Sequence, residues 1–429
     1  MYGMYDKLKL REKEGNPIQV GIIGVGQMGA EIVATIGEMD GMRAAVTVDL
    51  TIERAAAAHR QSRRPVKVTE TNDPDAAAKA VAEGGAVAAT DFSVATRLPQ
   101  VDVVVDATGS AEMGAVCSLD AIHHKKHVVM MSVECDVTIG PILKRMADDA
   151  GVVYGMAAGD EPAAIMEVWR FARSMGFEVV CAGKGKNNPL NIHATPDDVL
   201  EKANARRMSA KMLCEFVDGS KTAIEMAAVS NATGLVPDVR GMHAAKAAVP
   251  ELNRVFVPRK DGGVLERSGV VDFAIGVHPG VFLIVKTDNP CLVNGLSQRD
   301  MGSGPYYTLY RPYHLCSIEV PLTAANCVLY GESSGHPGPK LISECIAITK
   351  RDLKAGEALD GIGEYSYRGS IDLAATAIRE NLLPLGLARG YRLKRDVGKD
   401  RVLAYDMVEL DADSPLRQLR RLQDALRED

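Results

Sequence analysis

Residues 18–29, IQVGIIGVGQMG, carry the clearest signal of the fold class in the chain. The first half of this stretch is apolar and rich in β-branched residues, which predicts a buried strand. Residues 27–39 then carry apolar side chains at helical spacing. Between the two, Gly24, Gly26 and Gly29 form a GxGxxG pattern, which permits a tight turn, close approach of a pyrophosphate and close helix–strand packing. This strand–turn–helix unit predicts a dinucleotide-binding turn.

The residues around this turn supply the other contacts that a dinucleotide needs. The amides of Gln27 and Met28 fall at the start of the helix, where free N–H groups and the helix dipole favour phosphate. Asp49 ends the second expected strand, 42–50, where an acidic side chain meets the ribose hydroxyls. Arg54, one turn into the next expected helix, would reach a 2′-phosphate. Because the acid favours NAD and the arginine favours NADP, these residues leave the choice open.

Short β-rich runs alternate with Ala-rich helical stretches over the N-terminal third of the chain. Further strands are expected at 101–109 and 126–134, and a further helix at 51–61. Alternating βα units predict an α/β fold with a doubly wound parallel sheet. We therefore expect an NAD(P)-binding Rossmann domain over residues 1–158.

Polar residues cluster where two of these strands end. Asp106, Thr108 and Gly109 lie in DATGS, and Ser132 and Glu134 lie in MMSVE. Ligands of doubly wound sheets bind outside the carboxyl ends of the strands. These residues are therefore expected to line the nicotinamide side, although Glu134 would equally suit a plain loop carboxylate.

Two further domains are predicted after the first. A helix at 161–176 and a strand at 177–183 open a mixed region, which predicts an α+β catalytic and dimerisation domain over 159–340. A helix at 320–331 is expected to pack back on the first domain. Residues 341–429 are expected to form a small β-rich C-terminal domain.

The C-terminal region contains an internal repeat. ITKRDLKAGEALDGIG, residues 348–363, is echoed by RLKRDVGKDRVLAYD, residues 392–406. Two hairpin-like units that pair across a pseudo-twofold axis would explain the echo, and chance similarity is the alternative. Residues 413–429 predict a highly charged amphipathic helix with a solvated face.

Three positions, one carboxylate and two lysines, are candidates for catalysis or substrate binding. Asp160 opens the 161–176 helix in the sequence GDEP, where it would cap the helix or handle a proton or a metal. Lys184 and Lys186 lie in AGKGKNN, where glycines allow close approach and the lysines would grip a phosphate or carboxylate. A flexible basic loop is the alternative reading of that segment.

A run of tyrosines, YYTLYRPYHL at residues 306–315, stands out in a chain with only 5% aromatic residues. Arg311 would form a forked contact with an anionic substrate, and His314 would serve as an acid or base. A packed core and dimer segment is the alternative interpretation.

The segment CEFVDGS, residues 214–220, is expected to form a hairpin because Asp-Gly favours tight turns. It is flanked by three charged residues. They are Lys211, Lys221 and Glu225.

Composition excludes several classes of function. The net charge of −6 gives no electrostatic reason to expect nucleic acid or an anionic membrane as a partner. The first 15 residues are polar, and no apolar run approaches the ~20 residues that span a bilayer. We therefore expect a cytoplasmic protein whose scattered cysteines are reduced. No dense ligand motif predicts a structural zinc site.

A specific set of motifs extends over nearly the whole chain. They are GVGQMG, DATGS, VVMMSVECDVTIGP, AAGDEPAA, CAGKGKNNP, LYRPYHL and KRDLKAGEALDGIG. In this combination the chain resembles the 1-deoxy-D-xylulose 5-phosphate reductoisomerase-like (DXR-like, DRL) family.

The resemblance implies a homoserine-dehydrogenase-like N-terminal half and a C-terminal SAF-type domain. It also implies a homodimer that uses NADPH to convert 1-deoxy-D-xylulose 5-phosphate to 2-C-methyl-D-erythritol 4-phosphate, a step in isoprenoid precursor synthesis that fosmidomycin would block. Such a rearrangement needs a divalent metal (Mg²⁺ or Mn²⁺) or a lysine to polarise the ketone, and a base.

In this interpretation Lys184, Lys186 and Arg311 hold the small phosphorylated substrate, Asp160 and Glu134 act on protons or a metal, and His314 is a further acid or base. Two alternatives remain. One is a homoserine-dehydrogenase-like enzyme for another small anionic substrate, and the other is a non-catalytic nucleotide sensor.

Overall fold

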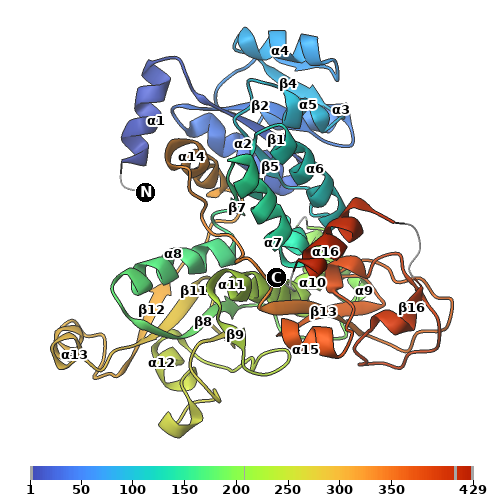
Figure 1. The fold of residues 1–429 in the computed structure, drawn as a ribbon. Helices are drawn as coiled ribbons and strands as arrows, with labels where there is room; N and C mark the ends of the chain where they lie inside the picture. The colour runs from blue at the N-terminus through green and yellow to red at the C-terminus, as the bar shows by residue number, and fades with distance from the viewer. Residues whose placement is uncertain (1–2, 207, 410–412, 427–429) are drawn as a thin grey trace. The chain divides into compact units, whose positions relative to one another are not determined.

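The structure is a computed structural model that describes residues 3–206, 208–409 and 413–426 (Figure 1). The chain packs as two compact units. The first contains residues 1–163, 315–339 and 414–429, and the second contains residues 164–314 and 340–413. The predicted division into three domains stays a prediction, because the packing groups these segments without separating 341–429 as one body.

The first unit is built on a parallel sheet of seven strands in the order β3-β4-β2-β1-β5-β6-β7. Since β1 lies between β2 and β5, the strand order reverses at β1, which is the point where doubly wound sheets bind their ligands. The strands are β1 (Ile18–Ile23), β2 (Met42–Val48), β3 (Val68–Glu70), β4 (Ala86–Ala89), β5 (Val103–Asp106), β6 (His127–Met130) and β7 (Tyr154–Met156).

The predicted α/β fold with a doubly wound parallel sheet is thereby confirmed, and the four predicted strands are present with shorter ends. The strand predicted at 126–134 ends at Met130, so Glu134 lies instead in the first turn of the next helix. Three short strands were missed. β4, for example, consists of Ala-Val-Ala-Ala and lacks the β-branched run that signals a strand.

Helices cover this sheet, and two of them come from distant parts of the chain. The local helices are α1 (Met4–Lys13), α2 (Gln27–Glu38), α3 (Ile52–His59), α4 (Pro74–Ala82), α5 (Ser93–Arg97), α6 (Ala111–His123) and α7 (Val133–Ala150). Helix α14 (Val320–Tyr330) packs against α1, α2 and the strands β1, β5 and β6, as predicted from the sequence.

The predicted C-terminal helix is present as α16 (Pro415–Ala425), and it packs on α6 and α7 of the first unit. It is more than a solvated face, because Leu416 and Leu419 are buried. The side-chain amide of Gln423 accepts from the Ile142 amide at 3.1 Å and donates to the Thr138 carbonyl at 3.1 Å. In an unbroken α7 the Ile142 amide would donate to the Thr138 carbonyl. Gln423 therefore replaces this helical hydrogen bond next to Pro141.

The second unit contains a mixed sheet of five strands in the order β12-β11-β8-β10-β9. The central strand, β8 (Glu178–Lys186), pairs parallel with β10 (Val270–Ile275) and antiparallel with β11 (Val281–Lys286). The edges are β9 (Val236–Pro237) and β12 (Tyr306–Arg311). The strand predicted at 177–183 thus exists and extends as far as both lysines.

Around this sheet lie α8 (Glu161–Ser174), α9 (Pro196–Ala205), α10 (Ala210–Val217), α11 (Ser220–Thr233), α12 (Leu252–Val255) and α13 (Pro290–Ser297). The hairpin expected at 214–220 is wrong, because these residues end α10, make a turn and begin α11. Asp218 and Gly219 serve a helix–helix turn, in which Gly219 is left-handed and the Asp218 carboxylate accepts from the Ser220 amide at 2.8 Å.

The C-terminal part of this unit pairs β13 (Ser343–Thr349) with β14 (Tyr367–Leu373), and adds α15 (Ala374–Arg379), β15 (Arg392–Leu393) and β16 (Val408–Glu409). The two predicted repeats pair with each other. Leu353 and Val397, the apolar residues after each Lys-Arg-Asp, exchange amide–carbonyl bonds of 2.9 and 3.0 Å.

Other bonds of this region come in equivalent pairs. The Asp352 carboxylate accepts from the Lys399 amide, and at the matching position Asp396 accepts from the Ala355 amide. The pseudo-twofold relation expected from the sequence is therefore present in the hydrogen bonding.

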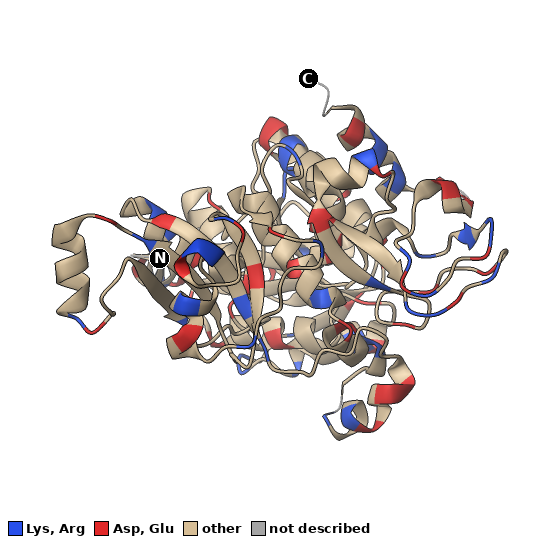
Figure 2. Ribbon diagram, turned by 90° about the horizontal axis from the view of Figure 1, so that it is seen from below, with Lys and Arg blue, Asp and Glu red and all other residues tan. Residues whose placement is uncertain are grey.

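Basic and acidic residues are interspersed along the chain, as Figure 2 shows. Within the described ranges, none of the helices has the length and apolar character needed to cross a bilayer.

Candidate functional site

The glycine turn after β1 has the geometry that a bound diphosphate requires. Gly24 has a positive φ of 89°, and a Cβ there would lie 2.6 Å from the Ala107 carbonyl oxygen. A Cβ on Gly29 would lie 2.1 Å from the Gly24 carbonyl oxygen. In contrast, a Cβ on Gly26 would meet no atom within 4 Å. Gly24 and Gly29 are thus fixed by packing, whereas the space at Gly26 is open to a ligand.

Helix α2 begins directly after this turn, at Gln27, with Gly26 as its N-cap. Because glycine has no side chain to cap the helix, the first amides, those of Gln27 and Met28, face the turn without a side-chain acceptor at the cap position. A helix start of this kind attracts phosphate through its N–H groups and dipole.

Asp49 follows β2 and is tied to the glycine turn. Its Oδ2 accepts from the Val25 amide at 3.0 Å, and its Oδ1 accepts from the Leu50 amide at 2.8 Å. The Arg54 guanidinium lies 3.3 Å from Oδ1, with its own side chain 58% exposed. Asp49 therefore holds the turn in place, and Arg54 offsets part of its negative charge.

The polar residues after β5 form a second edge of this site. The buried carboxylate of Asp106 accepts from the Thr108 hydroxyl at 2.8 Å, and the Ser132 hydroxyl accepts from the Gly109 amide at 2.9 Å. Burial is the largest cause that raises the pKa of Asp106, to about 6. Glu134, half-buried in the first turn of α7, adds to this rise. Thr108 and Gly109 thus lie at the carboxyl end of β5, in a loop fixed by Asp106 and Ser132.

In the second unit, β8 carries Lys184 and Lys186 two positions apart, so both side chains point to the same face of the sheet. Both lysines are buried. The Lys184 ammonium forms an ion pair with Glu225 of α11, and Lys186 donates to the Phe216 carbonyl oxygen of α10. Burial, followed by the charge of Lys184, lowers the pKa of Lys186 to about 8. The alternative reading of this segment as a flexible basic loop is wrong for both lysines, because they lie in the strand.

Arg311 lies on the same face as these lysines. Val281 of β11 pairs with Lys184 on one side and with Arg311 of β12 on the other. Residues directly opposite in neighbouring strands share a face, so Arg311 stands two strands from Lys184, about 10 Å away. Its Nε lies 3.6 Å from the Glu167 carboxylate of α8. His314 lies three residues beyond the end of β12 and is half-buried.

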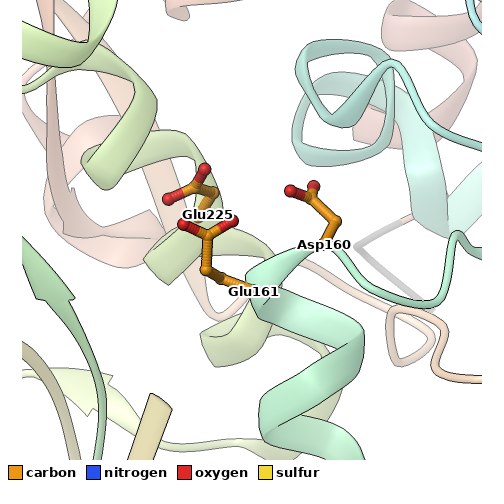
Figure 3. Close-up of side chains that lie close together, drawn as sticks. All are labelled: Asp160, Glu161 and Glu225. Carbon is orange, nitrogen blue, oxygen red and sulfur yellow. The ribbon is translucent and has the colours of Figure 1, made fainter. Parts of the chain in front are cut away.

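Three buried carboxylates lie close together, and Figure 3 shows their side chains converging. One oxygen from each of Asp160, Glu161 and Glu225 lies within 4.8 Å of the others. Glu161 begins α8 and Asp160 precedes it, and this continuous helix carries on into the second unit. Hard divalent cations prefer oxygen donors of this kind.

Two members of this group were missed from the sequence. The sequence predicts Glu225 only at the flank of a hairpin and Glu161 only at the start of a helix. The available signal for Glu225 was its position as a lone carboxylate in the apolar segment TAIEMAAV, four residues after Lys221 and hence on the same helical face.

Two family models match separate parts of the chain. Residues 24–141 match the family model described as the NAD binding domain of homoserine dehydrogenase. Residues 159–320 match the one described as the catalytic domain of oxidoreductase DRL. The first range includes the glycine turn, and the second includes Lys184, Lys186 and Glu225. Each match covers less than half of the chain, and together they support an NAD(P)-dependent oxidoreductase of the DRL type. No curated protein matches the chain.

Solved structures resemble the chain at low identity. Biliverdin reductase from Synechocystis sp. PCC 6803 has 16% identity and a TM-score of 0.29. The match covers 41% of this chain and 48% of the reductase, so the chain spans about half the length of that enzyme. A 3-ketoreductase from Actinomadura kijaniata has 10% identity and a TM-score of 0.37, over 74% and 91%. Scyllo-inositol dehydrogenase from Lactobacillus casei has 10% identity and a TM-score of 0.41, over 74% and 89%. At these values the structural likeness carries no functional argument.

Proposed function

We propose that this chain is an NADPH-dependent reductoisomerase that converts 1-deoxy-D-xylulose 5-phosphate to 2-C-methyl-D-erythritol 4-phosphate. The observation that carries the proposal is the pair of buried lysines on β8, one joined to Glu225 and the other with a pKa of about 8. An anionic substrate with a carbonyl group needs such a combination of cationic groups and a carboxylate.

In this reaction NADPH and one proton are consumed and NADP⁺ is released. Carbon–carbon rearrangement of the ketose first gives an aldehyde, which then accepts the hydride. Lys186 and Arg311 hold the substrate phosphate, because both are cations on one face of the sheet. Lys184 donates a hydrogen bond to the ketone oxygen, and Glu225 takes the hydroxyl proton whose loss begins the rearrangement. Glu134 and His314 are the remaining candidates for proton transfer.

A divalent metal fits the donor set of Asp160, Glu161 and Glu225, which are all carboxylates with oxygens within 4.8 Å of one another. These three residues would hold Mg²⁺ or Mn²⁺. A metal bound there would supply a Lewis acid for an oxygen of the substrate.

Two features support NADPH over NADH. The charge of Asp49 is partly offset by Arg54, and its oxygens are already engaged by the amides of Val25 and Leu50. Arg54 is exposed and would reach a 2′-phosphate. The resemblance to DRL proteins further implies a homodimer, a SAF-type role for the C-terminal repeat, and inhibition by fosmidomycin.

The test is an assay of the purified protein with 1-deoxy-D-xylulose 5-phosphate, NADPH and Mg²⁺ or Mn²⁺, in which NADPH oxidation and the methylerythritol product are both measured. The proposal expects stoichiometric product and inhibition by fosmidomycin. Lys184→Met should abolish turnover while NADPH still binds, and Lys202→Met, an exposed lysine on α9, should be active. NADPH oxidation with L-aspartate semialdehyde but not with the ketose would replace the proposal by a homoserine-dehydrogenase-like function.

A further inference from the structure

Lys350 is a buried lysine that follows β13, in the first copy of the C-terminal repeat. Its ammonium lies 2.7 Å from the Asp218 carboxylate, and both side chains are almost fully buried. It also donates to the Ala194 and Glu364 carbonyl oxygens at 2.8 and 2.7 Å. The matching lysine of the second copy, Lys394, is exposed. The repeat symmetry is therefore broken at this position.

Asp218, the ion-pair partner of Lys350, lies next to the proposed substrate site. Asp218 forms the turn between α10 and α11, where its carboxylate also accepts from the Ser220 amide. Two residues earlier, the Phe216 carbonyl accepts from Lys186. The helix that starts at Ser220 carries Glu225, the partner of Lys184.

The neighbouring strand adds to the same contact. The Gly369 amide of β14 donates to the Ser220 hydroxyl at 2.7 Å. Lys350 after β13 and Gly369 in β14 thus both hold the turn between α10 and α11. This turn orients Lys186 directly, and through α11 it places Glu225, the partner of Lys184.

We propose that Lys350 is a positioning residue, through which the C-terminal repeat fixes the α10–α11 turn and with it the placement of Lys186 and Glu225. This inference rests on the proposed function for its catalytic consequence. It assigns a role to the C-terminal repeat that does not require a ligand of its own.

The first experiment is independent of activity. Wild type, Lys350→Met and Lys394→Met are treated at pH 8 with an amine-acetylating reagent, and acetylation of each lysine is measured by mass spectrometry. In Lys350→Met, acetylation of Lys186 should rise about tenfold, because its carbonyl partner is no longer held. Lys126, a buried lysine of the first unit, reports general unfolding and should not change. Lys394→Met should match wild type at both positions.

The second experiment measures kinetics with 1-deoxy-D-xylulose 5-phosphate. Lys350→Met should lower kcat about 10- to 100-fold because Glu225 is displaced, and should raise the KM for the ketose because Lys186 is displaced, with NADPH affinity unchanged. Lys350→Arg should restore much of both values. If the wild type is inactive, the proposed function fails, while the acetylation pattern still decides the role of Lys350. Unchanged Lys186 acetylation in Lys350→Met, or a parallel rise at Lys126, would overturn the inference.

Discussion

The amide of Val25, in the glycine turn, donates a 3.0 Å hydrogen bond to the carboxylate of Asp49 at the end of β2. This contact joins the glycine turn to the position that meets the ribose in doubly wound folds. One carboxylate thereby shapes the turn, and we propose that it and Arg54 beside it together decide the choice of cofactor.

Arg54→Ala should weaken NADPH binding about tenfold, because a charge-assisted contact to the 2′-phosphate is lost. NADH, which lacks that phosphate, should bind with nearly unchanged affinity. Fluorescence titration of the reduced nucleotides measures both constants. Arg63→Ala removes an arginine that is 81% exposed and pairs with Glu38, so it serves as the control and should change neither affinity. An equal loss for both nucleotides in Arg54→Ala would argue against this role.

Activity should fall as the pH rises through about 8. Burial and the neighbouring Lys184 lower the pKa of Lys186 to about 8, so the ammonium that holds the substrate anion is lost above that pH. The pH profile of kcat/KM measures this fall. In Lys186→Arg the fall should disappear below pH 10, because guanidinium stays charged there. A wild-type profile that is flat between pH 7 and 9 would remove Lys186 from substrate binding.

Stability should fall on acidification because of His59. Burial lowers the pKa of this histidine to about 4, whereas its unfolded value is near 6.5. Between these values the unfolded chain binds a proton that the folded chain excludes, so stability is full above about pH 6.5 and falls by about 3 kcal/mol on the way to pH 4.

Urea unfolding at several pH values measures this dependence. In His59→Gln that component of the slope should vanish. In His123→Gln, which replaces an exposed histidine at the end of α6, the slope should match wild type. An identical slope in His59→Gln and wild type would contradict the account.

Gln423→Leu should destabilise the first unit by about 2 kcal/mol, because it leaves the buried Ile142 amide without its acceptor. The shape of the side chain is nearly kept, so the cost comes mainly from the lost hydrogen bonds. Thermal unfolding measures it, and Leu422→Ala, which alters the exposed neighbour on α16, should cost less than half as much. Equal Tm values for Gln423→Leu and wild type would show that the amide is not needed.

The sequence predicts the nucleotide half well because its signals are local. In residues 18–29 the strand, the turn and the helix start follow one another, and each glycine has its own steric reason. The repeat was also visible, since Leu353 and Val397 occupy matching positions in two similar segments.

The substrate half could be predicted only in part. The sequence predicts Lys184 and Lys186 as site residues, but Glu225, the partner of Lys184, is 41 residues away from it, and a single sequence does not show which distant residues meet. The Asp218-Gly219 pair does not distinguish two structures, because the same dipeptide that favours a hairpin also suits a turn between two helices. Tertiary packing decided between them.

Calorimetric titration of wild type and Gly26→Ala with NADPH tests whether the glycine turn binds the dinucleotide. A Cβ at Gly26 meets nothing in the protein, so the variant should fold with an unchanged Tm, yet the methyl group would occupy space that the diphosphate needs. The account predicts saturable binding by wild type and at least about tenfold weaker binding by Gly26→Ala. Absence of saturable binding by wild type, or equal affinity in the variant, would contradict it.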